Sequence, residues 1–143
     1  MRMLFAIAVG LIVAACTGSS SPLKPTADEG LAIMKRVTFE SSPEAKLQTA
    51  HDLLTHAEQY DRQVTASSST NTKMEAQRFR RSERATAAIL MRDAGADYVR
   101  QQRTDRARDV YQSIITIFTG ENEVSFRRGA EAALQRLNEG GSK

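Results

Sequence analysis

The chain has 143 residues, 20 Lys and Arg against 17 Asp and Glu, and one cysteine. This length suits one domain with a modest core. A single cysteine excludes an internal disulfide, so packing alone must hold the fold. The formal net charge of +3 is unevenly distributed along the chain.

The first residues have the features of an export signal. Arg2 is followed by an apolar run from Leu4 to Val13 and then by the small residues Ala14 and Ala15. A basic start, a short apolar stretch and small residues at the cut are typical of a signal peptide. The run is too short to cross a bilayer, which takes about 20 apolar residues. We therefore expect residues 1–15 to be a signal peptide that is removed.

The segment Val13-Ala14-Ala15-Cys16 resembles the lipobox of bacterial lipoproteins, although Val13 stands where leucine is commonest. The resemblance implies cleavage between Ala15 and Cys16, a diacylglyceryl group on the Cys16 thiol and acylation of the new amino terminus. Thr17 follows, where enteric bacteria use Asp to retain lipoproteins in the inner membrane. The resemblance therefore implies an outer-membrane protein that faces the periplasm. Ordinary secretion with an incidental Cys16, and an uncleaved anchor, remain the alternatives.

Residues 17–25 are rich in Gly, Ser and Pro. This composition predicts a flexible tether between the lipidated Cys16 and a folded domain. Nine residues at up to about 3.5 Å each span roughly 30 Å. Three acyl chains would hold the domain at the membrane permanently, because each buried methylene contributes about 0.8 kcal/mol.

Two helices are predicted in the first half of the domain, which we place at residues 26–139. Thr26 and Glu29 form a capping-box pattern ahead of an apolar face of Leu31, Met34 and Val37. Ser42-Pro43-Glu44 is a second start signal. Apolar residues then recur at spacings of three and four, which predicts a core-facing helix; they are Leu47, Ala50, Leu53, Leu54, Ala57, Tyr60 and Val64.

The polar tract 65–71 ends that helix, and Thr72-Lys73-Met74-Glu75 is a further capping-box pattern. No proline follows, so one helix is predicted over about 73–102. Gly95 costs about 1 kcal/mol against alanine within a helix, so its presence indicates close packing against a neighbour.

Two shorter helices complete the prediction. Thr104 or Asp105 caps a helix whose apolar face runs from Ala107 to Phe118 and which ends at Thr119-Gly120. The β-branched run 114–117 also suits a strand, but its helical spacing and the lack of any partner strand favour a helix. The last helix carries Val124, Ala130, Ala133, Leu134 and Leu137, and residues 140–143 form a disordered tail. The fold class predicted is all-α, with four or five helices in antiparallel hairpins.

The pattern Met91-x-x-Ala94-Gly95-x-x-Tyr98, followed by Ala107-x-x-x-Tyr111, resembles a tetratricopeptide repeat. The resemblance implies that Gly95, Tyr98, Ala107 and Tyr111 pack two helices together. Gly129 lies one 34-residue repeat period beyond Gly95. Met91, Ala94, Ile114 and Thr119 depart from the family's Trp, Leu, Ala and Pro. The resemblance covers residues 88–138, about one and a half repeats. A plain antiparallel bundle is the alternative.

Positive charge concentrates in residues 73–108, which hold ten Lys and Arg against five Asp and Glu. Arginine binds phosphate and carboxylate groups bidentately. Because the expected export makes nucleic acid an unsuitable partner, an acidic protein surface or lipid headgroup is the predicted target. The candidate binding residues are Arg78, Arg80, Arg81 and Arg84. The alternative is a solvated face with local pairs such as Arg80 with Glu83.

Catalytic chemistry has little support in the sequence. His51 and His56 are five residues apart and lack the spacing of a metal pair on one helix, so we expect both to be solvated or partly packed. No nucleophile elbow, Gly-rich phosphate loop or His/Cys metal set occurs. We expect no enzyme, no small-molecule substrate and no cofactor beyond the acyl chains on Cys16. The predicted function is a lipid-anchored adaptor for an envelope protein; the alternative is direct binding of an anionic envelope component by residues 73–108.

Overall fold

The computed structural model describes residues 22–38 and 40–140. These contain five α-helices and a short 3-10 helix: α1 (Lys24–Met34), α2 (Pro43–Ala66), α3 (Thr70–Arg100), α4 (Thr104–Ile117), η1 (Glu121–Glu123) and α5 (Val124–Gly140). No strand occurs in these ranges, which confirms the all-α prediction. The predicted signal peptide, Cys16 and the last three tail residues lie outside the described residues, so those assignments stay predictions.

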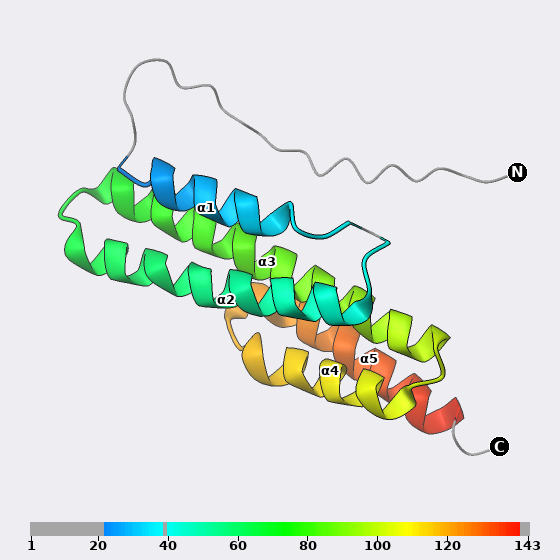
Figure 1. The fold of residues 1–143 in the computed structure, drawn as a ribbon. Helices are drawn as coiled ribbons and strands as arrows, with labels where there is room; N and C mark the ends of the chain where they lie inside the picture. Colours follow the sequence, from blue (N-terminus) through cyan, green and yellow to red (C-terminus); the bar gives the residue numbers. More distant parts are fainter. Residues whose placement is uncertain (1–21, 39, 141–143) are drawn as a thin grey trace, which may run out of the picture.

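The helices are arranged so that each packs mainly against its neighbours in sequence. α2 and α3 form a long antiparallel hairpin, and α1 lies along one part of it (Figure 1). α4 and α5 form a second hairpin against the half of α3 that ends at Arg100. The predicted hairpin architecture is therefore present, with one long hairpin as its centre.

The first helix begins earlier than predicted. α1 starts at Lys24, and no side chain caps it, so the capping box at Thr26 is wrong. The hydroxyl of Thr26 instead accepts a hydrogen bond of 2.8 Å from Nε2 of Gln63 on α2. Leu23 is buried at the start of α1. The predicted tether 17–25 is therefore too long, because its last three residues belong to the folded domain.

The buried side of α1 also differs from the prediction. Gly30 and Ile33 are buried, whereas Leu31 and Met34 are only half-buried and Val37 lies beyond the end of the helix. The predicted face is therefore correct only in part, because Met34 packs against the larger core while polar groups lie beneath Gly30, as described below.

The starts of α2 and α3 depend on serine caps. Ser42 accepts a hydrogen bond of 3.2 Å from the backbone N–H of Ala45, which confirms the predicted start of α2. α3 begins at Thr70, and Ser69 caps it by accepting from the N–H of Thr72 at 3.4 Å. The predicted capping box of Thr72 with Glu75 is wrong, because the polar tract itself supplies a serine cap one turn earlier.

α4 starts without a side-chain cap. Its N-cap residue is Arg103, so the predicted cap at Thr104 or Asp105 is wrong. The chain turns tightly there instead, with the N–H of Arg103 donating to the carbonyl of Tyr98 at 2.8 Å. The β-branched run 114–117 is helical as predicted. α5 continues through Gly140, where the disordered tail was expected to begin.

The core has two parts. The larger lies among α2, α3, α4 and α5 and includes Ile33 of α1, with Leu53, Ile114 and Phe118 almost fully buried. The smaller joins the start of α1 to the far end of the long hairpin, where Leu23 packs with Tyr60 and Ala76. α1 is thus fixed at its start by this small cluster and near its end by Ile33, which belongs to the larger core.

Two glycines differ in their surroundings: one lies at a close helix contact and the other at an open surface. A Cβ on Gly95 would lie 2.7 Å from Cε1 of Tyr111, so only glycine fits between α3 and α4. This confirms the close packing expected at Gly95. A Cβ on Gly129 would meet nothing within 4 Å. The tetratricopeptide-like arrangement of residues 88–138 is not confirmed, because the second periodic glycine serves no close approach and α3 extends far upstream of the matched segment.

The two glycines give a matched pair of stability predictions. Gly95→Ala should lower the free energy of unfolding by about 1–3 kcal/mol, because the added methyl group overlaps the Tyr111 ring. Gly129→Ala should raise it by up to about 1 kcal/mol, because alanine is the better helix former and its methyl group meets open space. Urea unfolding followed by circular dichroism measures both. Equal effects of the two changes would contradict the packing described here.

Candidate functional site

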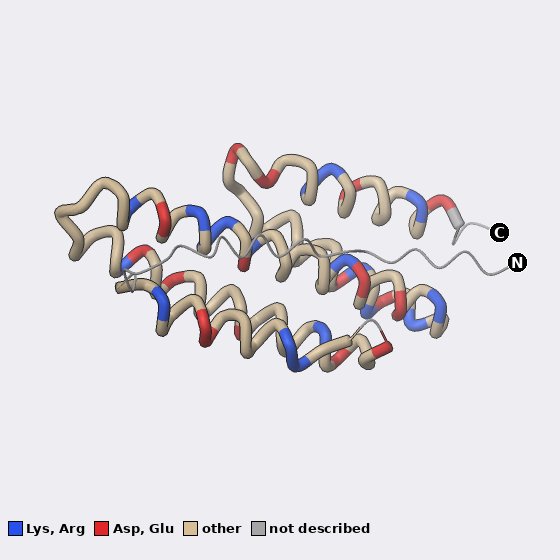
Figure 2. The backbone as a smooth tube through the Cα atoms, turned by 90° about the horizontal axis from the view of Figure 1, so that it is seen from above, with Lys and Arg blue, Asp and Glu red and all other residues tan. Residues whose placement is uncertain are grey.

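Charged residues are spread along all the helices, with Lys and Arg interspersed among Asp and Glu (Figure 2). The predicted anion-binding arginines can bind a partner only where they are not already paired within the chain. The structure places Arg78, Arg80, Arg81 and Arg84 on α3, but they do not share one environment.

Arg84 connects three elements. Its Nε and Nη2 donate to the two carboxylate oxygens of Glu123 at 2.6 and 3.0 Å, and Nη2 also donates to the carbonyl of Ile117 at 3.0 Å. Its guanidinium lies 5.2 Å from the ring centroid of Phe118. Bidentate pairing of this kind is among the stronger polar contacts in proteins. Arg84 therefore holds the α4–η1 corner against α3 and is not available to a partner.

Of the other three arginines, one is paired with a carboxylate and two are unpaired within the described part of the chain. Nε of Arg80 lies 3.1 Å from a carboxylate oxygen of Asp61 on α2, so the predicted local pair of Arg80 with Glu83 is not formed. Arg78 and Arg81 are exposed, and their side chains have no ion pair or hydrogen bond among the described residues. Of the four candidates, only these two are free for a partner.

Glu123 is a carboxylate whose charge stabilises the fold. Burial raises its pKa, but the hydrogen bonds from Arg84 and from the N–H of Gly120 outweigh burial, and the pKa lies below its ordinary value of 4.5. A group with a depressed pKa contributes stability above its unfolded pKa and loses that contribution as the pH falls. The bidentate contact should therefore weaken below about pH 4.5.

Glu123→Gln should lower the free energy of unfolding at pH 7 by about 1–3 kcal/mol, the usual range for a hydrogen bond to a charged group. The difference from the wild type should shrink as the pH falls below 4.5, because the Glu123 carboxylate of the unfolded chain then takes up a proton before that of the folded protein does. Unfolding curves across pH 2–7 test this. Glu121→Gln, two residues away and exposed, is the control; a difference that is constant with pH would contradict the assignment.

A buried polar cluster lies between α2 and α3. Nδ1 of His56 is 2.8 Å from Oε2 of Glu83, and the hydroxyl of Tyr60 donates to Oε1 at 3.2 Å. His56 and Glu83 are each 2 % exposed. Burial raises the pKa of Glu83, and its bonds to His56 and Tyr60 offset only part of that rise. The prediction of a solvated or partly packed histidine is wrong for His56 and correct for the exposed His51.

α1 covers this buried cluster. A Cβ on Gly30 would overlap Oε1 of Glu83, so only glycine allows α1 to approach. Nε2 of His56 has no hydrogen-bond partner among the described residues, and it lies 3.6 Å from Oε2 of Glu29 on α1. The cluster contains acid–base side chains, but it is closed to solvent. Its evident role is to attach α1 to the long hairpin.

The helical spacing in the sequence indicated that the residues of this cluster are buried, although their polar side chains indicated a surface position. His56 follows Leu53 by three residues and precedes Tyr60 by four, so it lies on the buried side of α2. Glu83 precedes the buried Ala87 by four. We expected a surface position from charge alone, because an unpaired buried carboxylate is costly.

Removing the Glu83 carboxylate should therefore destabilise the fold strongly. Glu83→Ala should lower the free energy of unfolding by about 2–5 kcal/mol, because it leaves the buried groups of His56 and Tyr60 without an acceptor. α1 should also become more sensitive to protease. Glu58→Ala, an exposed glutamate on α2, is the control. Chemical denaturation and limited proteolysis measure the two effects, and a loss within the control's range would contradict the attachment.

A buried ion pair joins the start of α2 to the end of α3. Nζ of Lys46 lies 2.6 Å from Oδ2 of Asp97, and both residues are buried; Arg100 also pairs with Asp97. A buried pair of this kind is strongly destabilising to break, because the remaining charge stays uncompensated. The pair therefore links these two helix ends.

The predicted packing residue Tyr98 belongs to this end as well. Its hydroxyl donates to Oε1 of Glu44 at 3.1 Å, and Arg103 donates to the same oxygen at 2.7 Å while lying 4.6 Å over the Tyr98 ring. Tyr98, Ala107 and Tyr111 are all buried in the larger core. They pack helices together as predicted, but Tyr98 also contacts α2.

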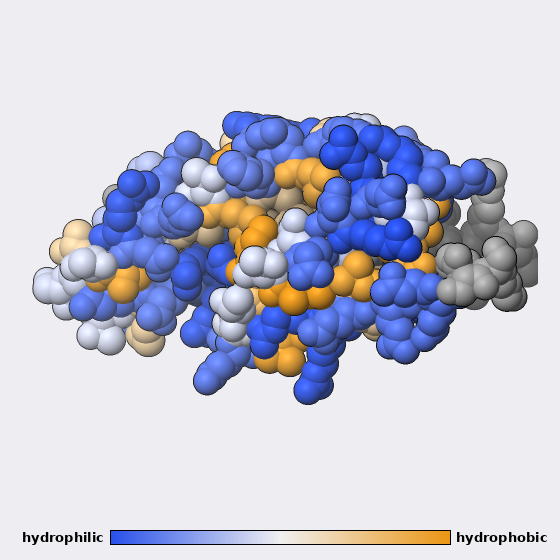
Figure 3. All heavy atoms as spheres, turned by 90° about the horizontal axis from the view of Figure 1, so that it is seen from below, coloured by the Kyte–Doolittle hydropathy of each residue, from blue (hydrophilic) through white to orange (hydrophobic). Residues whose placement is uncertain are grey.

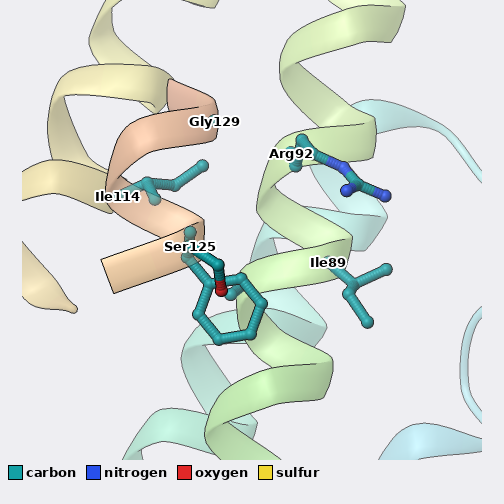
Figure 4. A pocket seen from close by; sticks show the side chains of 7 residues that line it. Ile89, Arg92, Ile114, Ser125 and Gly129 are labelled. Atoms are coloured by element: carbon teal, nitrogen blue, oxygen red, sulfur yellow. The ribbon is translucent and has the colours of Figure 1, made fainter. Parts of the chain in front are cut away.

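Small hollows are present on the surface of the described residues. One of about 230 Å³ lies among α2, α3 and α4, and one of about 40 Å³ lies among α3, α4 and α5 (Figure 4). Both are smaller than the roughly 300–1,000 Å³ of typical ligand sites. Apolar side chains gather over the middle of the face seen in Figure 3, bordered by hydrophilic ones.

Within residues 22–38 and 40–140, no group of three His, Cys, Asp or Glu side chains is placed to hold a metal ion. In the same ranges, every helix is too short or too polar to span a bilayer.

Comparison with protein-family models, with curated proteins and with solved structures gave no match for this chain. Its function must therefore be argued from its own residues.

Proposed function

We propose that this protein is a non-catalytic helical adaptor, anchored by lipid in the outer membrane and facing the periplasm, where it binds an envelope protein. Machinery for envelope assembly, secretion or pilus formation is the class of partner that suits such an adaptor. The observation that carries the proposal is the segment Val13-Ala14-Ala15-Cys16 after an apolar run and close to the start of the helical domain.

The short distance between anchor and domain supports this reading. Leu23 is already buried in the domain, so only residues 17–22 separate it from Cys16. Six residues at about 3.5 Å each reach at most roughly 20 Å. A lipid on Cys16 would thus hold α1 close to the bilayer and leave the more distant helices for a partner.

The use of the polar side chains supports a binding role over a catalytic one. The acid–base residues His56, Glu83 and Tyr60 are buried and attach α1 to the long hairpin. Arg84 is paired with Glu123 across elements. These groups stabilise the fold and are not placed around a hollow that can admit a substrate.

The second candidate function is direct binding of an anionic lipid or another envelope polyanion. The exposed and unpaired Arg78 and Arg81 favour it. Arg80 and Arg84 do not, because each is paired with a carboxylate of the same chain. Two arginines are a narrow basis for binding a polyanion, so the adaptor remains the preferred proposal.

The anchor is tested by palmitate labelling of the wild type and Cys16→Ala in a bacterium with two membranes, followed by membrane fractionation. We expect labelling and outer-membrane retention for the wild type and loss of both for Cys16→Ala. Cys16→Ala keeps the whole helical domain, so an unfolded product is not the explanation of such a loss. Membrane retention of unlabelled protein, or no label at all, would overturn the lipid anchor.

The adaptor role is tested separately by crosslinking in the same cells. We expect wild-type protein to crosslink to a specific envelope protein and Cys16→Ala to lose most of that product. Failure to recover any specific neighbour from lipidated, correctly localised protein would count against the adaptor while leaving the anchor intact.

A further inference from the structure

One side of the long helix α3 is uncovered by the rest of the described chain. Met74, Ile89 and Val99 are exposed by 58, 44 and 41 %, and they are three of the four large apolar side chains found exposed in the described ranges. They belong to a line of residues at spacings of three and four, which we name the α3 strip. Its members are Met74, Arg78, Arg81, Ala85, Ile89, Arg92, Ala96 and Val99.

The strip lies away from the buried side of the helix. That buried side, which packs on α2, includes Ala76, Ala87 and Ala94. At about 100° per residue, the strip is centred roughly 160° from those alanines around the helix. Its length from Met74 to Val99 is about 38 Å at 1.5 Å per residue. It is long enough for a partner helix of seven turns.

The charge of the strip has one sign. Arg78, Arg81 and Arg92 alternate with the apolar residues, and the strip contains no acidic residue. Arg78 and Arg81 have no ion pair within the part of the chain that the structure describes. The guanidinium of Arg92 lies 3.7 Å from its neighbour Asp93, a weak contact. The strip therefore complements a surface that carries carboxylates.

The strip continues into the smaller hollow. Ile89 and Arg92 of α3 line that hollow together with Ser125 and Gly129 of α5 (Figure 4). The space beside Gly129 is open. The strip therefore borders this hollow at Ile89 and Arg92.

We propose that the α3 strip binds an acidic amphipathic helix of a partner protein. The proposal rests on the adaptor function and names the chemistry of its partner. Carboxylates at spacings of three and four on the partner would face the three arginines, and apolar residues between them would contact Ile89 and Val99. Ala85 and Ala96 are small, so the backbones of the two helices can approach closely. This is the helix-against-helix mode of recognition, with charge setting the register.

A protein helix fits the strip better than a bilayer surface does. Helices that lie in a membrane interface need a wide, continuous apolar side, commonly with Trp or Phe. The strip has three large apolar side chains separated by arginines and contains neither Trp nor Phe. Its apolar area is therefore too small to enter a bilayer, while its arginines are spaced to pair with individual carboxylates.

The test uses the full-length lipidated protein in a neutral detergent and two designed helical peptides. One peptide carries Glu at helical spacings of three and four among Leu and Ala, and the other has Lys in place of each Glu. Fluorescence anisotropy at low salt should show binding of the Glu peptide only. Changing Arg78, Arg81 and Arg92 together to Glu should weaken that binding at least tenfold and create binding of the Lys peptide. Added salt should weaken both interactions.

The matched control changes three exposed arginines outside the strip, Arg62, Arg106 and Arg128, to Glu. This variant has the same net charge and should keep the affinity for the Glu peptide within about twofold. The gain of Lys-peptide binding shows that the strip variant is folded and separates a docking surface from nonspecific attraction.

Three outcomes would overturn the proposal. They are equal weakening by strip and control variants, no binding of the Glu peptide, and strip-dependent binding of phosphatidylglycerol vesicles without peptide binding, which would assign the strip to lipid. None of these depends on palmitate labelling. The docking surface can therefore fail while the anchor of the proposed function stands.

Discussion

The close antiparallel packing of α2 against α3 is the constraint on which the other helices depend. Buried alanines on both helices allow the approach: Ala50 and Ala57 on α2, and Ala76, Ala87 and Ala94 on α3. Polar contacts at two places along the hairpin then set its register, Lys46 with Asp97 and His56 with Glu83. Small side chains bring the helices close, and the buried polar groups make a shifted register costly, because each needs its partner.

The other elements attach to this hairpin by different means. α1 is held by the small cluster around Leu23, by the fit of Gly30 over Glu83 and by Ile33 in the larger core. α4 is held by a larger apolar surface, by Tyr111 against Gly95 and by the contact of Arg84 with Glu123. The segment nearest the proposed lipid thus has the smaller attachment. Charged residues such as Glu83 and Arg84, which the sequence suggested were on the surface, connect helices in the fold.

This division of the charged residues supports the proposed docking surface. Arg80 and Arg84 connect helices, whereas Arg78 and Arg81 lie with Arg92 on the side of α3 that no described helix covers. A long helix with one side committed to its hairpin and the other lined by arginines and separate apolar residues is suited to bind another helix. Anchor and strip would then have separate tasks, one fixing location and the other selecting a partner.

The sequence by itself determined the helical class, the helix order, the cap at Ser42 and the close packing at Gly95, because periodicity and capping depend on residues a few positions apart. Helix starts were misplaced by two or three residues at α1 and α3, where several side chains competed as caps. Tertiary structure alone decided which charged residues are buried and paired. Lys46 with Asp97 and Arg84 with Glu123 are joined across 51 and 39 positions, and local spacing carries no information about such partners. The lipid anchor remains a sequence prediction, because Cys16 precedes the residues that the structure describes.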